Sequence, residues 1–135
     1  YKDELDEQII LKKWDQHMWD NRQANEFRVF IFNQNITAIS QYSCYDDYNF
    51  KRFENDFSEI LNQIKRIQTH IQTFFKPKNY ALDVFVEKTE KISVTFVEIN
   101  AFGMESPCGS CLFHWLDDQK VLYGDGSLVE IRYVE

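Results

Sequence analysis

The chain has 135 residues, of which 22 are acidic and 15 are basic, so its formal net charge is −7. This length suits roughly one ordinary domain, and the 44% of hydrophobic residues supply enough material for one packed core. The acidity argues against direct binding to nucleic-acid backbone, which needs clustered Lys and Arg. No apolar run reaches the roughly 18 residues of a membrane span. Three cysteines suit a reducing compartment, so a soluble cytoplasmic protein is expected.

The first part of the chain predicts short strands. Residues 8–14 (QIILKKW) form an apolar run that predicts a strand, and the polar residues 15–25 predict a loop or a short helix. Residues 26–32 and 36–41 are rich in aromatic and β-branched side chains, and an Asn-Gln-Asn turn at 33–35 separates them. This pattern predicts a β-hairpin.

Residues 50–76 contain the clearest helical pattern, because apolar side chains recur there at steps of three and four. The stripe consists of Phe53, Phe57, Ile60, Leu61, Ile64, Ile67, Ile71, Phe74 and Phe75. Pro77 is expected to end the helix, because proline cannot continue the backbone hydrogen bonds. We interpret the stripe as the face that packs on a sheet.

Two further strands are predicted at 80–87 and 92–100, around the polar connection 88–91. Both carry apolar residues on both faces, as in a sheet that is covered on both sides. A glycine-containing loop follows, and residues 127–134 predict a last strand. The order predicts an α+β fold: a mainly antiparallel sheet with a long amphipathic helix packed on it.

Polar side chains interrupt these apolar strands. Glu98 and Asn100 are two residues apart and therefore project from the same face, and pairing of the two strands brings Asp83 close to Glu98. Neighbouring carboxylates repel unless a cation joins them, and oxygen ligands favour a hard ion such as Mg²⁺. The alternative is that the three residues lie on a solvated face.

Arg28 is a second polar residue within an apolar strand. Its guanidinium group can hold a phosphate with two hydrogen bonds, or it can pair with an acidic side chain such as Glu26 or Asp46. The sequence leaves both alternatives open.

Cys108 and Cys111 form a C-x-x-C motif, which occurs in zinc sites and in redox pairs. Cys44 and His114 are the only obvious further ligands, and the motif lacks the βαβ context of a redox pair. Two ordinary free thiols are the alternative.

Several of these segments together resemble a known family. ILKKW, EFRVFI, AISQY, the long helix, LDVFVE, VEINAFG and LFHW occur in that order. The set resembles the C-terminal half of the cell division cycle protein 123 family, whose members have an ATP-grasp fold, over roughly residues 9–115. The resemblance implies that residues 1–135 are one domain, the C-terminal lobe. The front lobe, with its phosphate-gripping lysine, has no counterpart before Tyr1.

The resemblance also implies roles for individual residues. Backbone groups around Leu11 and Lys12 would meet the adenine of ATP, and Arg28 would contact its phosphates. Asp83, Glu98 and Asn100 would hold Mg²⁺ between the phosphates.

The sequence departs from the family pattern in three places. Glu98 stands where Asp is usual, and Ala101 stands where Pro is usual. Residues 108–111 replace a segment that is more often acidic and hydroxyl-bearing, which indicates a different partner surface beside the metal site.

Two functions follow from the resemblance. The first is an assembly factor, or chaperone, for the translation initiation factor two complex, with a subunit of that complex as its partner. The second is an ATP-dependent ligase that forms an acyl phosphate and transfers the acyl group to a nucleophile. A module that binds no nucleotide, with a purely structural acidic patch, is the third alternative.

Overall fold

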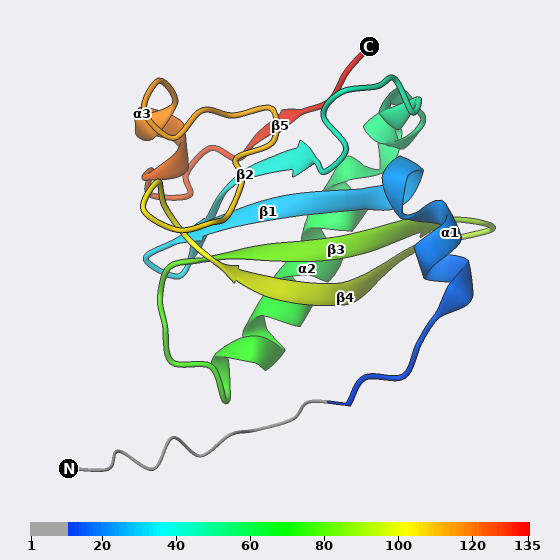
Figure 1. The fold of residues 1–135 in the computed structure, drawn as a ribbon, viewed down its shortest axis with the longest axis horizontal. Coiled ribbons are helices and arrows are strands. Elements are labelled where there is room, and N and C mark those ends of the chain that lie inside the picture. Colours follow the sequence, from blue (N-terminus) through cyan, green and yellow to red (C-terminus); the bar gives the residue numbers. More distant parts are fainter. Residues whose placement is uncertain (1–10) are drawn as a thin grey trace.

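The computed structural model describes residues 11–135, in which five strands form one sheet that is crossed on one face by helix α2 (Figure 1). The strands are β1 (Glu26–Phe32), β2 (Asn35–Gln41), β3 (Tyr80–Lys88), β4 (Ile92–Ala101) and β5 (Glu130–Arg132). The helices are α1 (Gln16–Asn25), the 3₁₀ helix η1 (Phe50–Asp56), α2 (Phe57–Gln72) and α3 (Gln119–Leu122). None of the helices between residues 11 and 135 has the length and apolar character needed to cross a bilayer.

The strand order is β4-β3-β1-β2-β5. All pairs are antiparallel except the short parallel pair of β2 with β5. The α+β fold with a mainly antiparallel sheet and a long packed helix is therefore confirmed.

The strand expected at residues 8–14 is not formed in its described part. Residues 8–10 lie outside the described residues, and residues 11–15 have no regular secondary structure. The polar segment that follows is a helix, α1, whose first turn is capped by the Asp15 carboxylate accepting from the Met18 backbone N–H at 2.9 Å. Because α1 contains no buried residue, it has no apolar face to reveal it in the sequence.

The long helix is divided and shorter than expected. Its first part is η1, and α2 ends at Gln72 before Pro77 is reached. The chain turns at Phe75, whose backbone N–H donates to the Ile71 carbonyl at 2.8 Å and whose ring packs edge-on against Tyr80, with centroids 5.3 Å apart. This aromatic contact directs the chain into β3, so the end of the helix is set by tertiary packing.

The last strand is also shorter than the predicted 127–134, because only Glu130–Arg132 pair with β2. Asp125 accepts a hydrogen bond from the Ser127 backbone N–H at 2.9 Å, which holds the preceding residues in a turn.

Both faces of the sheet are covered, as the mixed apolar pattern of β3 predicts. The α2 face contains the main core, in which Ile60, Ile64 and Ile71 of α2 are buried against the sheet. On the opposite face, residues 102–122 cover one end of the sheet with a second cluster. This cluster consists of Phe30, Ala38, Ala81, Cys108, Phe113, Trp115 and Leu122.

A β-bulge in β4 decides which side chains point to this opposite face. From Lys88↔Ile92 to Val84↔Phe96 the hairpin pairs regularly, but the next pair is Asp83↔Glu98. The extra residue, Val97, changes the phase of the strand. Without the shift, Glu98 would lie opposite the buried Leu82 on the α2 face. The bulge therefore places Glu98 beside Asp83.

The backbone at Gly126 offers a test of the β2–β5 end of the fold. Its φ of +76° is unfavourable for residues with a side chain, and an added Cβ would lie 2.8 Å from the Cβ of Asn35. Gly126→Ala is expected to lower the free energy of unfolding by about 1–3 kcal/mol, measured by urea denaturation. Gly109→Ala is the control, since its nearest neighbour would be at an ordinary 3.8 Å. Equal stability of both variants would contradict the strained turn.

Candidate functional site

Arg28 and Asp83 form an ion pair on the face of the sheet opposite α2. They lie directly opposite each other on β1 and β3. The Arg28 Nε and Nη2 groups donate to the two Asp83 carboxylate oxygens, each at 2.8 Å. Both side chains are buried, with exposed fractions of 7% and 0%. Of the alternatives left open by the sequence, Arg28 therefore pairs with an acid, and this acid is Asp83 rather than Glu26 or Asp46.

Two groups of β4 complete the cluster around Asp83. The Asn100 side-chain amide donates to Asp83 Oδ2 at 2.9 Å, and Glu98 lies opposite Asp83 in the register. Burial raises the pKa of Asp83, Arg28 opposes this effect, and the nearby Glu98 carboxylate raises the pKa further. The convergence expected for Asp83, Glu98 and Asn100 is thus present, and Asp83 lies at its centre.

Glu26 adds a third carboxylate to the same face, two residues before Arg28 on β1. One of its oxygens, Oε2, accepts from Arg22 Nε of α1 at 3.0 Å. The other, Oε1, is buried and has no hydrogen-bond partner among residues 11–135. Burial raises the pKa of Glu26, and Arg22 counteracts this only in part.

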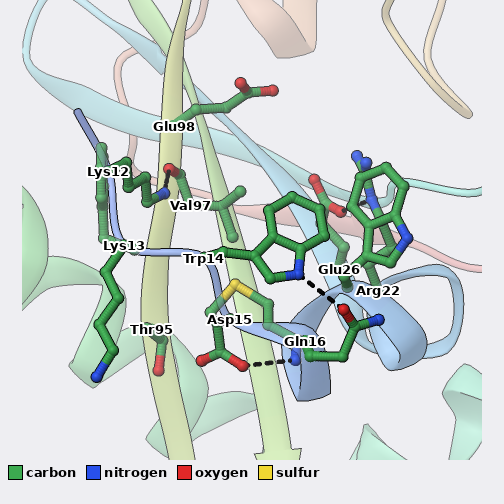
Figure 2. Close-up of a pocket in the computed structure, with 13 residues that line it drawn as sticks. Lys12, Lys13, Trp14, Asp15, Gln16, Arg22, Glu26, Thr95, Val97 and Glu98 are labelled. Carbon is green, nitrogen blue, oxygen red and sulfur yellow. Dashed lines mark hydrogen bonds and ion pairs between the residues drawn. The ribbon is translucent and has the colours of Figure 1, made fainter. Parts of the chain in front are cut away.

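A groove of about 860 Å³ lies between α1, the segment before it and β4 (Figure 2). It is lined by Lys12, Lys13, Trp14, Asp15, Gln16, Met18, Trp19, Arg22, Glu26, Thr95, Phe96, Val97 and Glu98. Lys12 Nζ donates to the Val97 carbonyl at 2.6 Å, at the bulge of β4. Glu26 and Glu98 therefore connect the groove with the cluster around Asp83.

Leu11 and Lys12, the two residues expected at the adenine, differ in their position relative to the groove. Lys12 lines the groove, whereas the Leu11 side chain is 93% exposed and does not belong to the lining. The role expected for Leu11 was that of its backbone groups. These groups make no hydrogen bond with another residue of the described range 11–135.

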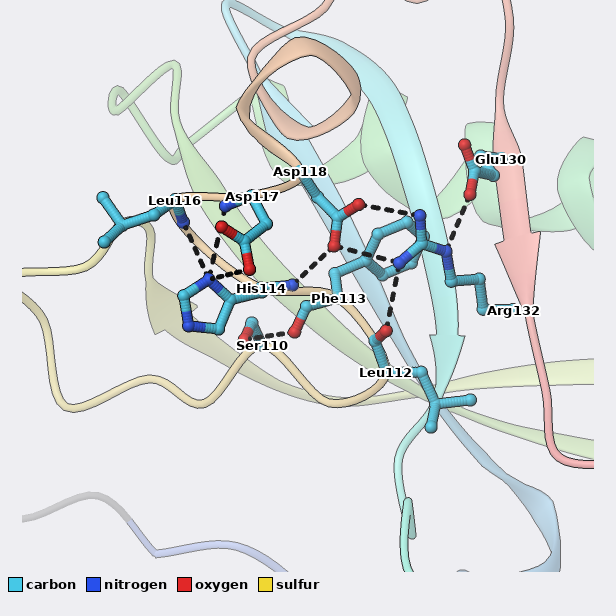
Figure 3. Close-up of polar contacts among 9 residues, drawn as sticks. All are labelled: Ser110, Leu112, Phe113, His114, Leu116, Asp117, Asp118, Glu130 and Arg132. Atoms are coloured by element: carbon cyan, nitrogen blue, oxygen red, sulfur yellow. Dashed lines mark hydrogen bonds and ion pairs between the residues drawn. The ribbon is translucent and has the colours of Figure 1, made fainter.

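The loop over Arg28 is fixed from its far end by a second ion pair (Figure 3). The Gly109 carbonyl accepts from Arg28 Nη1 at 2.7 Å. Farther along the chain, Arg132 binds both carboxylate oxygens of Asp118 at 2.9 and 2.8 Å and lies 4.1 Å from the centroid of the Phe113 ring. These hydrogen bonds lower the pKa of Asp118. Strand β5 thereby holds the loop that supplies the Gly109 carbonyl.

The C-x-x-C motif contributes thiols to this loop. All three cysteines are free, and burial raises the pKa of Cys108, and that of Cys111 to about 12. Within residues 11–135, no three or more His, Cys, Asp or Glu side chains are grouped so that they could hold a metal ion. The geometry therefore favours two ordinary thiols over a zinc site.

Three further residues contribute to this face, and their roles were not predicted from the sequence. Glu26 was considered only as a partner for Arg28, although strand periodicity already places the two on the same face. Arg22 is four residues before Glu26, a spacing that is meaningful only because residues 15–25 are helical. Tyr42 follows β2 directly and lies over Arg28, and no sequence signal distinguishes it from the other tyrosines.

The chemistry of the face follows from these contacts. It presents the oxygen atoms of Asp83, Glu98 and Asn100 next to the cation Arg28, in a partly dehydrated setting. Carboxylate and amide oxygens suit a hard divalent cation, and a guanidinium group suits phosphate.

Comparison with known proteins shows sequence similarity over the whole chain. A family model described as D123 matches residues 1–135. A Candida albicans protein named translation initiation factor eIF2 assembly protein is 29% identical over 140 residues and 98% of this chain. A Xenopus tropicalis protein of the same name is 32% identical over 111 residues and 80% of this chain. The matched regions are only 36% and 30% of those proteins, so the chain spans about a third of their length.

The fold is similar to that of a solved protein as well. Cdc123 from Schizosaccharomyces pombe matches with a TM-score of 0.62 and 20% sequence identity, covering 82% of this chain and 40% of the other. A C-terminally truncated form of the same protein matches equally well. These matches support the fold expected from the sequence.

The buried ion pair leads to a stability prediction. Asp83→Ala leaves the Arg28 guanidinium buried without its counter-charge, so the free energy of unfolding should fall by about 3–5 kcal/mol, as measured by chemical denaturation. The double variant Asp83→Leu with Arg28→Met removes both charges and should be markedly more stable than Asp83→Ala. If the single variant were as stable as the wild type, the pair would have no structural role.

Proposed function

Because the chain belongs to the D123 family, we propose that it supplies the Mg²⁺- and ATP-binding face of an assembly factor for the translation initiation factor two complex. The single observation that supports binding is the cluster of Arg28, Asp83, Glu98 and Asn100 beside the groove. The assembly role is proposed from the names of the two curated relatives. Residues 1–135 would act as one lobe of the binding site.

The residues fit a divalent cation. Asp83 and Glu98 are two neighbouring carboxylates: burial raises the pKa of Asp83, Arg28 opposes this effect, and repulsion from Glu98 raises the pKa further. A divalent cation would remove this repulsion. Asp83 Oδ1 accepts one hydrogen bond from Arg28 and retains a further lone pair, whereas Oδ2 accepts from both Arg28 and Asn100. Mg²⁺ typically takes one or two carboxylates together with phosphate oxygens.

The residues also fit a nucleotide. The groove joins the apolar rings of Trp14 and Phe96 to the polar cluster, which suits a molecule with a flat apolar part and an anionic part. Glu26 lines the groove, and its buried Oε1 has no donor among residues 11–135, so a hydrogen-bond donor on an occupant that reached this atom would satisfy it.

Roles can be assigned to the chain's own groups. Asp83, Glu98 and Asn100 would hold Mg²⁺, which supplies neutralisation of phosphate charge when it is bound. Arg28 is oriented by Asp83 and Gly109, and it would hold a phosphate with its remaining N–H groups. Lys12 is held on β4 by Val97, so the segment at the edge of the groove is fixed to the strand that carries Glu98.

Binding and assembly are favoured over ligation because the side chains of the cluster are held by one another, as the hydrogen bonds of Asp83 illustrate. Arg28 and Asn100 hold the Asp83 carboxylate with three hydrogen bonds and leave one acceptor site on Oδ1, which suits a fixed ligand rather than a general base. The ligase alternative predicts that ADP and phosphate are released when a carboxylate acceptor is added.

Glu98 allows the metal role to be tested without disturbing the core, because its side chain is exposed. In the full natural protein, Glu98→Gln should weaken Mg·ATP binding by roughly tenfold or more, since the amide removes one anionic ligand, while the unfolding midpoint stays near that of the wild type. Isothermal titration calorimetry measures both proteins. Glu90→Gln, in the exposed β3–β4 turn, is the matched control and should bind like the wild type. Equal affinity of all three proteins would exclude Glu98 as a ligand.

The assembly role is tested in cells that depend on the protein. Replacement of the wild type by Glu98→Gln should reduce the amount of assembled initiation factor two complex while free subunits accumulate, as measured by immunoprecipitation of one subunit and quantification of the others. Glu90→Gln should restore normal amounts. Normal assembly in cells that lack the protein altogether would contradict the role, and acceptor-dependent ADP release would favour the ligase.

A further inference from the structure

The ring of Tyr42 lies next to the two guanidinium groups on the polar face. The Cζ atom of Arg28 is 4.9 Å from the ring centroid and that of Arg22 is 5.5 Å from it. Tyr42 follows the last residue of β2, and its backbone N–H donates to the Glu26 carbonyl at 2.9 Å. Because Ser40 is the residue opposite Arg28, Tyr42 is the diagonal neighbour of Arg28 across the strand pair, a distance that an aromatic side chain spans.

Arg28 is almost completely constrained by its surroundings. Three of its five N–H groups are used, two on Asp83 and one on the Gly109 carbonyl. These three contacts lie in the plane of the guanidinium group, so they leave its flat faces without a hydrogen bond. The Arg28 Cζ atom lies over the Tyr42 ring, and a cation over an aromatic ring is attracted by the ring's electrons.

Arg22 extends the arrangement towards the groove. Its guanidinium lies 5.1 Å from the Trp19 ring as well as 5.5 Å from that of Tyr42, and its Nε donates to Glu26. The face therefore contains two arginines, each bound to its own carboxylate and both in contact with one tyrosine ring. The two guanidinium groups carry like charges and repel each other, and the attraction of both to the Tyr42 ring helps to hold them in place.

We propose that Tyr42 is a positioning residue for phosphate binding. The Tyr42 ring holds the Arg28 guanidinium in the orientation that binding the anionic part of the ligand requires. It acts through Arg28 and needs no contact with the ligand itself. The ring is the active part, because the hydroxyl makes no hydrogen bond with residues 11–135 and is uncharged at neutral pH, with burial raising its pKa further. The inference rests on the proposed function, since it specifies how this face holds phosphate.

Two substitutions distinguish the effect of the Tyr42 ring on Mg·ATP binding from the effects of its hydroxyl and of its side-chain volume. Tyr42→Phe keeps the ring, so its affinity for Mg·ATP should stay within about twofold of the wild type. Tyr42→Leu keeps an apolar side chain but removes the ring, and it should weaken Mg·ATP binding by roughly five- to tenfold. Adenosine, which lacks phosphate, should bind equally to all three proteins in ligand-observed NMR. A general disturbance of the fold would weaken both ligands.

A second measurement follows Arg28 directly. In protein labelled with ¹⁵N-arginine, the Arg28 Nε–H signal should exchange slowly with water in the wild type and in Tyr42→Phe, and at least several-fold faster in Tyr42→Leu. This measurement requires no ligand.

The outcomes distinguish this inference from the function on which it rests. Normal Mg·ATP binding by Tyr42→Leu, or equal losses of adenosine and Mg·ATP, would overturn the positioning role while leaving the proposed function intact. A wild-type protein that binds no Mg·ATP would overturn both. Loss of Mg·ATP affinity in Tyr42→Leu alone, together with faster exchange at Arg28, supports the proposal.

Discussion

The ion pair between Arg28 and Asp83 is buried in the middle of the sheet, and the arrangement of its polar face depends on it. Removing two such charges from water costs several kcal/mol for each ion, and this cost is offset only when the geometry is good and further hydrogen bonds complete the pair. Here Asn100 donates to the carboxylate and the Gly109 carbonyl accepts from the guanidinium. The ion pair thereby links β1, β3, β4 and the loop beyond β4.

The two faces of the sheet divide stability and binding between them. The α2 face is an apolar core in which helix and strands bury large side chains, and it supplies most of the hydrophobic stabilisation. With this core in place, the opposite face can accommodate three carboxylates and two arginines. The loop on this face is held independently by Arg132 and Asp118, so the carbonyl that orients Arg28 does not depend on a ligand.

This division fits the binding and assembly role that we propose for the protein. The groove is formed on one side by α1, a helix with no buried residue that is attached to the sheet through polar contacts such as His17 with Glu87 and Asn25 with the Val86 carbonyl. Contacts of this kind are individually weak because water competes for them. One wall of the groove is therefore less firmly held than the strands on which Asp83, Glu98 and Asn100 lie.

The sequence by itself determined the features that depend on local pattern. The hairpin of β1 and β2, the apolar stripe of α2 and the β3–β4 hairpin follow from spacing, because side-chain periodicity is a local property. The approach of Asp83 to Glu98 was expected from the pairing of the two strands, but regular pairing would have placed Glu98 on the α2 face, and only the bulge at Val97 brings the two together. The change of phase at Phe96-Val97 is visible as two adjacent apolar residues, although a bulge cannot be placed from that signal alone.

Only the tertiary structure decided the rest. Arg28 selects Asp83 because β1 and β3 are neighbours, and 55 residues of chain separate the two. The short parallel β5 was likewise set by its pairing with β2, a distant segment of the chain. A charged side chain in an apolar strand indicates that a partner of opposite charge is needed. Which residue becomes that partner depends on which strand lies next to it in the sheet. For that reason the sequence identified Arg28, Asp83, Glu98 and Asn100, and the fold determined how they are paired and added Arg22, Glu26 and Tyr42 to the same face.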